Sequence, residues 1–233
     1  MAMISTQLQQ VRERVAHACH QAGRPADAVR LLAVSKTFDA NAVLEAVAAG
    51  QQAFGENYVQ EGVEKIHTLH AAGVTGLEWH CIGPLQSNKT RPVAEHFDWV
   101  HTVDRLKIAQ RLSEQRPAHL PPLQVCIQVN VDGGPNKAGV SPTEALALVR
   151  GVAALPHLRL RGLMCIPEPA PDFEAACRVF GQARAVYEAL QAAGLPLDTL
   201  SMGMSDDLEA AVASGSTLVR VGSAIFGRRH YPA

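Results

Sequence analysis

The chain has 233 residues, a formal net charge of −1 and a hydrophobic content of 47%, which suit one large domain or two small ones with a sizeable core. The near-neutral charge argues against a broad nucleic-acid-binding surface, and an aromatic content of 5% argues against a platform for base stacking. No apolar run approaches the roughly 18 residues that a membrane span needs, and the amino terminus lacks the pattern of a secretory signal. We therefore expect a cytoplasmic protein that binds neither nucleic acid nor membrane.

The cysteine and histidine residues indicate neither a disulfide framework nor a metal site. The five cysteines are odd in number, widely spaced and free of any C-x-x-C pattern, which favours a reduced, cytosolic protein. His80 and His101 each lie at the end of a predicted strand, but the chain contains no H-x-H or H-E-x-x-H spacing. We therefore expect no metal.

One strand–helix–strand segment organises the rest of the predicted fold. The apolar run 31–34 predicts a buried strand that stops near Lys36, and Asp39 is the predicted N-cap of the helix that follows. A second short strand, 52–55, leads into Asn57. Two strands joined in this way are expected to be parallel with a right-handed crossover. Since functional groups gather at the carboxyl ends of such strands, Lys36 and Asn57 become candidate site residues.

Two interpretations of Lys36 stay open at this point. Most lysines are solvated surface charges, and many strands end in one as the chain reaches water. The run before Lys36 is apolar without alternation, however, so this lysine emerges directly from the predicted core. A partly desolvated lysine loses proton affinity and becomes an amine nucleophile, for instance towards an aldehyde.

The alternation of strand and helix continues to the end of the chain. A first helix over 4–22 precedes the segment described above, and residues 85–89 begin a loop or a helix. Ser141, Pro142 and Glu144 form the pattern of a capped helix start. Further strands are predicted over 79–82, 98–102, 123–131, 158–166, 197–202 and 217–221, and further helices over 59–71, 105–115, 173–193 and 205–213, the last capped by Ser205.

Eight strands, each followed by a helix or a helix start, predict a single (β/α)8 barrel over residues 1–233 with one extra helix in front. An open doubly wound sheet is the alternative. It would need fewer strands and a glycine-rich phosphate turn after the first strand, but the loop that follows residue 34 contains no glycine. The barrel is favoured.

The barrel predicts a phosphate site beside the lysine. In barrels the loops after strands seven and eight frequently bind phosphate, and here those loops contain Gly203, Gly222 and Ser223. The alternative is that these glycines only form turns. Arg220 on the last strand would lie between this site and Lys36, so a ligand with an aldehyde at one end and a phosphate at the other would fit. Pyridoxal 5′-phosphate (PLP) is such a ligand, and it attaches to lysine as a Schiff base.

Several motifs, in order along the whole chain, resemble those of the pyridoxal phosphate homeostasis protein family. This resemblance implies the barrel of alanine racemase and ornithine decarboxylase without their second β-domain. The motifs are AVSKT (33–37), FGENYVQE (54–61), WHCIGPLQSNK (79–89), NKAGV (136–140), GLMCIPEP (162–169) and SMGMSDDLEAAVASGSTLVRVGSAIFG (201–227).

The resemblance also implies roles for nine residues. Lys36 would form the Schiff base with PLP, and Arg220 would face the pyridine nitrogen. Ser223 stands where this family has either serine or threonine. The remaining residues would hold the phosphate (Ser201, Gly203, Gly222 and Ser223) or line the ring (Asn57, His80 and Met202).

Arg220 favours storage of the cofactor over catalysis. A guanidinium only donates hydrogen bonds, so the ring nitrogen would stay unprotonated and PLP would be a weaker electron sink. A racemase also needs a second acid/base on the opposite face of the ring. In alanine racemase that group comes partly from the second domain and the partner subunit, whereas here only residues 228–233 follow Gly227. Tyr58, which follows Asn57, is the nearest candidate for this second acid/base.

We therefore expect a monomeric PLP-binding protein that buffers or delivers the cofactor, with no catalytic residues of its own. Apo forms of PLP-dependent enzymes, or enzymes of vitamin B6 metabolism, are the expected partners. Two alternatives stay open: a racemase-like PLP enzyme with weak activity, and a sugar-phosphate enzyme that uses Lys36 as its Schiff base. Lys89 and Lys137 lie in exit loops and either pass the cofactor on or are solvated.

Overall fold

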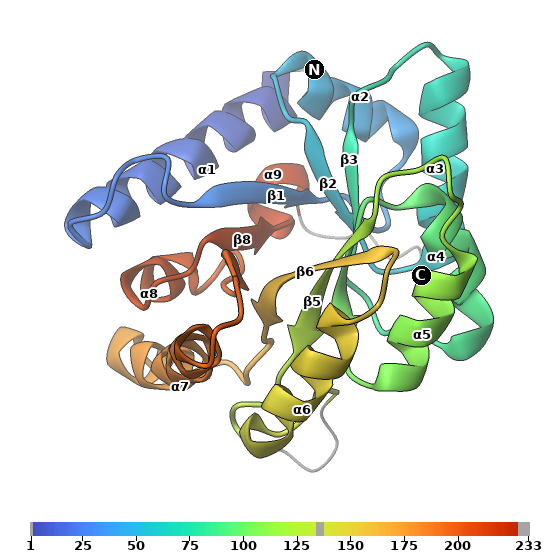
Figure 1. The fold of residues 1–233 in the computed structure, drawn as a ribbon. Helices are drawn as coiled ribbons and strands as arrows, with labels where there is room; N and C mark the ends of the chain where they lie inside the picture. Colours follow the sequence, from blue (N-terminus) through green and yellow to red (C-terminus); the bar gives the residue numbers. More distant parts are fainter. Residues whose placement is uncertain (1, 134–137, 228–233) are drawn as a thin grey trace, which may run out of the picture.

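The computed structural model describes residues 2–133 and 138–227, and its eight strands close into one parallel barrel in the order β1 to β8 (Figure 1). This confirms the predicted (β/α)8 fold. No helix in the described ranges is both long enough and apolar enough to span a bilayer. The strands are β1 Arg30–Val34, β2 Ala53–Glu56, β3 Glu78–Cys81, β4 Trp99–Val103, β5 Leu123–Gln128, β6 Leu158–Met164, β7 Thr199–Ser201 and β8 Leu218–Val221.

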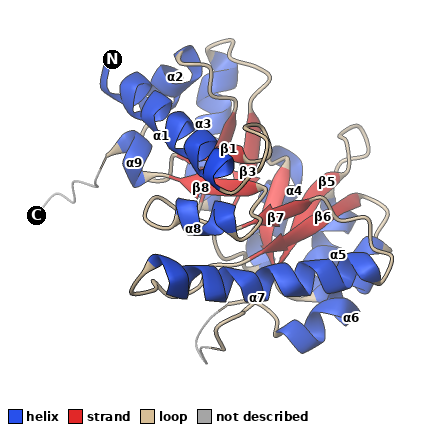
Figure 2. Ribbon diagram, turned by 90° about the vertical axis from the view of Figure 1, so that its left-hand side faces the viewer, coloured by secondary structure: helices blue, strands red, loops and turns tan. Residues whose placement is uncertain are grey.

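The helices surround the barrel (Figure 2). The segment 85–89, predicted as the start of a loop or a helix, leads through a short 3-10 turn into α4. The helices are α1 Ala2–Gln21, α2 Ala40–Ala48, α3 Val59–Ala71, the 3-10 helix η1 Ser87–Lys89, α4 Thr90–His96, α5 Leu106–Gln115, α6 Pro142–Ala153, α7 Phe173–Ala192, α8 Leu208–Ala213 and α9 Ser223–Phe226.

The extra helix α1 joins the two ends of the fold. It packs against α2, α8 and α9, and Leu8, Val11 and Val15 on one of its faces are buried. Arg14 forms a two-pronged ion pair with Glu209 of α8, at 3.0 and 3.1 Å. The predicted helix before the barrel is therefore part of its outer layer.

Helix caps account for several boundaries. Asp39 caps α2 by accepting a hydrogen bond from the Ala42 N–H at 3.0 Å, and the capping box between Ser141 and Glu144 begins α6, both as predicted. The cap predicted at Ser205 is wrong. Asp207 occupies the N-cap position of α8, because its carboxylate accepts from the Met204 N–H at 2.6 Å and closes a turn before the helix begins.

The barrel interior has an apolar part and a polar part. Alternate strand residues face outwards and form the main core with the helices. One buried apolar cluster joins residues of β1, β2 and β8 to the residue after β3: Leu32, Val34, Ala53, Leu218 and Ile82. The buried polar residues that point inward include His80, His101, Ser201 and Arg220.

Candidate functional site

A cavity of about 440 Å³ opens at the carboxyl ends of the strands. That volume is within the range of about 300–1,000 Å³ common for small-molecule sites. It brings together five of the nine predicted site residues: Lys36, Asn57, Arg220, Gly222 and Ser223. Its other lining residues are Val34, Phe38, Ile82, Ile166, Met204, Ser205, Asp206 and Gly227.

Lys36 lies in a tight turn directly after β1. The side chain is partly buried, and the turn is closed by the Phe38 N–H, which donates to the Ser35 carbonyl at 3.1 Å. Thr37 has φ = +69°, a left-handed conformation that is a true outlier for a β-branched residue. Local strain of this kind persists only where the surroundings hold the backbone in place.

The surroundings are a buried charged group that we call the Lys65 cluster: Ser35, Glu56, Glu61 and Lys65. The Lys65 ammonium donates to Glu56 Oε1 at 2.8 Å, to Glu61 Oε1 at 2.6 Å and to the Ser35 carbonyl at 2.7 Å. The Ser35 hydroxyl also donates to Glu56 Oε1, at 2.6 Å. Glu56 is fully buried and Lys65 nearly so, with 0% and 6% of their side chains exposed.

The Lys65 cluster fixes the backbone on both sides of Lys36. One contact is to the Ser35 carbonyl, and the other is from the Thr37 N–H, which donates to Glu61 Oε1 at 2.5 Å. Burial raises the pKa of Glu56, while the nearby charge of Lys65 opposes that shift. The Lys65 cluster therefore positions Lys36 by holding the backbone of the turn on both sides of it.

Arg220 is held through its own side chain. Its NH1 donates to the Ser201 hydroxyl at 2.8 Å, and its NH2 donates to the Cys165 carbonyl at 2.9 Å. Burial lowers the pKa of this guanidinium, yet arginine remains charged at any pH where the protein is folded. The site thus contains a fixed cation beneath the cavity.

Asn57 contributes an unsatisfied acceptor to the cavity. Its side-chain oxygen is buried and has no hydrogen-bond partner among the described residues. Gly83 packs against the backbone of Asn57, since a Cβ atom at position 83 would lie 2.1 Å from the main-chain carbonyl oxygen of Asn57. Glycine is thus required at 83 to keep Asn57 in place.

The exit of β8 supplies small and hydroxyl groups. A Cβ atom at Gly222 would lie 3.1 Å from the Val34 carbonyl oxygen, so a small residue lets β8 end close to β1. The Ser223 hydroxyl is 3.1 Å from the Ser205 hydroxyl, which in turn accepts from the Ala224 N–H at 3.4 Å. Two hydroxyl groups and the start of α9 therefore meet at this edge of the cavity.

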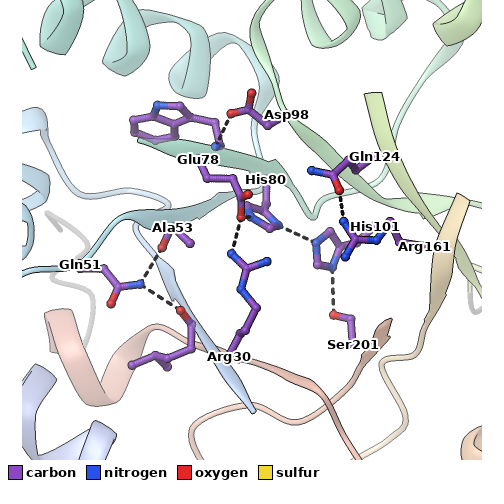
Figure 3. A network of polar contacts seen from close by, with 12 residues as sticks. Arg30, Gln51, Ala53, Glu78, His80, Asp98, His101, Gln124, Arg161 and Ser201 are labelled. Carbon is purple, nitrogen blue, oxygen red and sulfur yellow. Dashed lines mark hydrogen bonds and ion pairs between the residues drawn. The ribbon is translucent and has the colours of Figure 1, made fainter. Parts of the chain in front are cut away.

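Four of the nine predicted residues are not among those that line the cavity, and their assignment to the site stays a prediction. His80 is fully buried, because it points into the barrel between two residues that face the helices, and its ring contacts Glu78 and His101 (Figure 3). The Ser201 hydroxyl is used by Arg220 and His101. Met202 faces the helices as part of the main core, and Gly203, with φ = +97°, packs against Ala211.

The sequence analysis missed several lining residues. Met204 and Ser205 follow β7 directly, and their place in a strand exit was the available signal. Asp206 also lines the cavity, one residue before the N-cap of α8 at Asp207. Of the two loop lysines, Lys89 is exposed and does not line the cavity, and Lys137 lies outside the described residues.

The described residues show no disulfide and no metal cluster. None of the five cysteines forms a disulfide, and four of them are buried. No group of three or more histidine, cysteine or acidic side chains in the ranges 2–133 and 138–227 is placed to hold a metal ion.

Comparison with known sequences gives full-length similarity to one group of proteins. The family model "Alanine racemase, N-terminal domain" matches residues 6–230. The pyridoxal phosphate homeostasis protein of Escherichia coli K12 is 55% identical over 228 residues, covering 98% of this chain and 97% of the relative. The protein of the same name from Pseudomonas aeruginosa is 56% identical over 233 residues, covering 100% and 99%.

Solved structures give the same result for the fold. PipY of Synechococcus elongatus, solved with PLP bound, has a TM-score of 0.82 at 38% identity and covers 96% of this chain and 100% of its own. Alanine racemase of Clostridium difficile has a TM-score of 0.74 at 17% identity, covering 100% of this chain but 58% of its own. The second similarity shows a common barrel fold only.

Proposed function

This chain belongs to the family of pyridoxal phosphate homeostasis proteins, and from that premise we propose that it binds PLP beside Lys36 and holds the cofactor for delivery. One observation carries the proposal. A lysine on a fixed turn and a buried, hydrogen-bonded arginine line the same cavity. The relative PipY has been solved with PLP bound and shares the barrel over its whole length.

The cavity residues fit the chemistry of PLP. Lysine is the usual attachment point for its aldehyde, and Lys36 and Arg220 outnumber the single carboxylate of Asp206, as suits an anionic ligand. Val34, Ile82 and other apolar side chains provide walls for a flat ring. The unsatisfied oxygen of Asn57 would gain a partner from a donor on the ligand, which would offset the cost of its burial.

Arg220 has a defined effect on a bound pyridine. When bound, the cofactor supplies an aldehyde that condenses with amines and a ring that withdraws electrons from them. A guanidinium has donors only, so its partner nitrogen must accept a hydrogen bond and stay unprotonated. Arg220 thereby reduces the electron-withdrawing power of the ring and favours storage over bond cleavage.

The lining residues also favour a carrier over an enzyme. A racemase needs a second proton-transfer group on the far face of the ring, and the described lining residues include no tyrosine, histidine or cysteine. Tyr58 is 57% exposed and does not line the cavity. The racemase-like alternative remains the second candidate, because the fold is shared with alanine racemase and Asp206 is a carboxylate in the cavity.

The proposal is tested by loading the purified protein with PLP and recording its visible absorption. We expect a band that survives gel filtration, and borohydride treatment followed by peptide mapping should place the reduced adduct on Lys36. Lys36→Ala should weaken binding by about 100-fold, the effect of losing one covalent contact of roughly 3 kcal/mol net. A wild-type protein that stays colourless at saturating PLP would refute the proposal and favour a sugar-phosphate ligand.

Amino-acid racemisation and cofactor transfer separate the two candidate functions. A carrier should restore activity to an apo PLP enzyme on mixing and should not racemise alanine above the rate of free PLP. We further propose that the protein is cytoplasmic, supported by cysteines that form no disulfide, and that it acts as a monomer. Light scattering after size exclusion, and fractionation of the source cells, test those two points.

A further inference from the structure

A continuous path of hydrogen bonds crosses the barrel from its amino-terminal end to Arg220. Figure 3 shows this path from Glu78 to Ser201. We call these five residues the interior chain: Glu78, His80, His101, Ser201 and Arg220. The contacts are Glu78 Oε1 to His80 Nε2 at 2.7 Å, His80 Nδ1 to His101 Nε2 at 2.8 Å, His101 Nδ1 to Ser201 Oγ at 2.9 Å and Ser201 Oγ to Arg220 NH1 at 2.8 Å.

The Glu78 end of the interior chain, with both rings neutral, determines the direction of every hydrogen bond in it. The Glu78 carboxylate only accepts, so a neutral His80 carries its proton on Nε2, donates it to Glu78 and accepts at Nδ1. The donor to His80 Nδ1 is then the Nε2–H of His101, which leaves His101 Nδ1 to accept from the Ser201 hydroxyl. The Ser201 oxygen in turn accepts from Arg220, which can only donate. Each neutral member donates once and accepts once.

The surroundings keep both histidines neutral. His80 and His101 are each 0% exposed, and burial lowers the pKa of both rings. The His80 ring stacks on Trp99, with centroids 5.2 Å apart and planes inclined by 9°. A proton added to His80 would place two donors face to face between the rings, and one added to His101 would face the Ser201 hydroxyl that donates to the same nitrogen. Only the amino-terminal end is open to solvent, where Arg30 donates to Glu78 at 2.6 Å and its side chain is 51% exposed.

We infer that Glu78, His80 and His101 are positioning residues for the PLP site: through Ser201 they fix the orientation of Arg220 beneath the cofactor. This inference rests on the proposed function. The Ser201 oxygen accepts from Arg220 while its proton is donated to His101, so His101 fixes the orientation of the hydroxyl that holds Arg220. Glu78 does not touch the cavity, so it acts on the cofactor only through this chain.

The first test needs neither a variant nor PLP. Nitrogen-15 NMR of the wild-type, ligand-free protein with labelled histidine reports which ring nitrogen carries the proton. We expect both His80 and His101 as neutral Nε2–H tautomers from pH 6 to pH 8. A neutral Nδ1–H form or a charged ring at either position would overturn the inference, because the directions derived above would then be impossible.

The second test removes the hydrogen bond at the Glu78 end of the interior chain. Glu78→Leu removes the acceptor of His80, and we expect PLP to bind about tenfold more weakly, with a shifted visible band. Glu78→Gln keeps an acceptor oxygen and should restore both properties. Glu188→Gln is the matched control, since Glu188 pairs with Arg184 on α7 outside the chain, and it should change neither.

A second variant distinguishes a positioning role from an effect on the overall stability of the fold. His101→Phe breaks the chain at a fully buried ring and should weaken PLP binding by a similar factor. The double variant Glu78→Leu with His101→Phe should bind PLP no more weakly than the worse of the two single variants, because both substitutions interrupt the same series of hydrogen bonds. Losses that add, or a Glu78→Leu protein that is less stable but keeps wild-type affinity and spectrum, would overturn the inference.

The two proposals fail in different ways. If the wild-type protein does not bind PLP at all, the proposed function fails, while the tautomers measured without ligand still support or overturn the interior chain. If wild-type protein binds PLP on Lys36 and the Glu78 and His101 variants bind it equally well, the proposed function stands and the positioning role is refuted.

Discussion

Lys36 and Arg220 line the same cavity but are held by regions of opposite construction. The Lys65 cluster lies between the ends of β1 and β2 and helix α3, and consists mainly of charged groups. The interior chain lies within the barrel and joins two neutral histidines and a serine between its charged ends. The first holds the backbone around Lys36, whereas the second holds the Arg220 side chain itself.

The difference corresponds to the role that we propose for each cation. A lysine that bonds and releases an aldehyde needs a fixed base and a side chain able to move, which contacts to the flanking backbone provide. An arginine that keeps a ring nitrogen unprotonated needs a fixed guanidinium, which hydrogen bonds to its own nitrogens provide. Charged groups suit the turn around Lys36, because strong ionic contacts hold its strained backbone. Neutral groups suit Arg220, because a neutral histidine or serine does not compete with the guanidinium for the anionic ligand.

The largest expected effect comes from removing the centre of the Lys65 cluster. Lys65→Met leaves Glu56 buried without its cation, and we expect the free energy of unfolding to fall by about 3–5 kcal/mol. Urea unfolding measures this loss. Lys89→Met, at an exposed lysine, is the control and should stay within about 0.5 kcal/mol.

The double variant Lys65→Met with Glu56→Gln sharpens this prediction. It removes both charges, so a large part of the lost stability should return. If Lys65→Met were as stable as the wild type, the cluster would not hold the turn through charge, and the contrast with the interior chain would fail.

The two regions should respond to pH with opposite signs. The folded-state pKa values of His80 and His101 are lowered by burial, so the stability of the neutral rings is present above about pH 6.5 and is lost as the pH falls. Glu78 acts in the same direction: burial raises its pKa, but His80 and Arg30 outweigh that and lower it to about 2. Its stabilising effect is present above about pH 4.5 and is lost towards pH 2.

Glu56 has the reverse dependence. Its folded-state pKa is raised, chiefly by burial, so its contribution is fully present below about pH 4.5 and is lost as the pH rises through the raised value. Urea unfolding between pH 4.5 and pH 8 separates the two regions. His101→Phe should lose less stability than the wild type on acidification, and Glu56→Gln should lose less on alkalinisation, by about 1.4 kcal/mol for each unit of pKa shift removed. Equal slopes in all three proteins would contradict the assignment.

The smallest effect concerns the strained residue next to Lys36. Thr37→Gly relieves a left-handed backbone at a β-branched residue and keeps the N–H that donates to Glu61. After the greater flexibility of unfolded glycine is taken into account, we expect a gain of about 1 kcal/mol in unfolding free energy. The same substitution at Thr68, within helix α3, should instead lower the free energy of unfolding by a few tenths of a kcal/mol. A loss at position 37 would show that the turn is not strained.

Most of the fold could be predicted from local patterns. Apolar runs located all eight strands to within a few residues, and the caps at Asp39 and Ser141 marked two helix starts. Where prediction failed, a neighbouring contact decided the outcome. The Ser205 cap is wrong because Asp207 closes a turn onto Met204 first, an interaction that sequence alone ranks no higher than the serine cap.

The site was only half predictable, for a geometric reason. Lys36, Asn57 and Arg220 lie at or near strand ends, where the mouth of a barrel must be. His80 and Ser201 were placed there too, but both point into the barrel, where other interior side chains occupy their polar atoms. Local sequence does not signal these distant partners. The Lys65 cluster was invisible for another reason: Lys65 lies thirty positions after Ser35, and nothing local to either residue signals the contact.

Helix α1 has a consequence for how the protein is made. Its apolar face at Leu8, Val11 and Val15 leaves the ribosome well before α8 and α9, which cover it. Strand β1 likewise waits for β8 to pair along its free edge. At typical synthesis rates the delay is on the order of ten seconds or more, and contacts this distant in sequence form slowly. The barrel can therefore close only after β8 has been synthesised, and until then the apolar face of α1 and the edge of β1 stay uncovered.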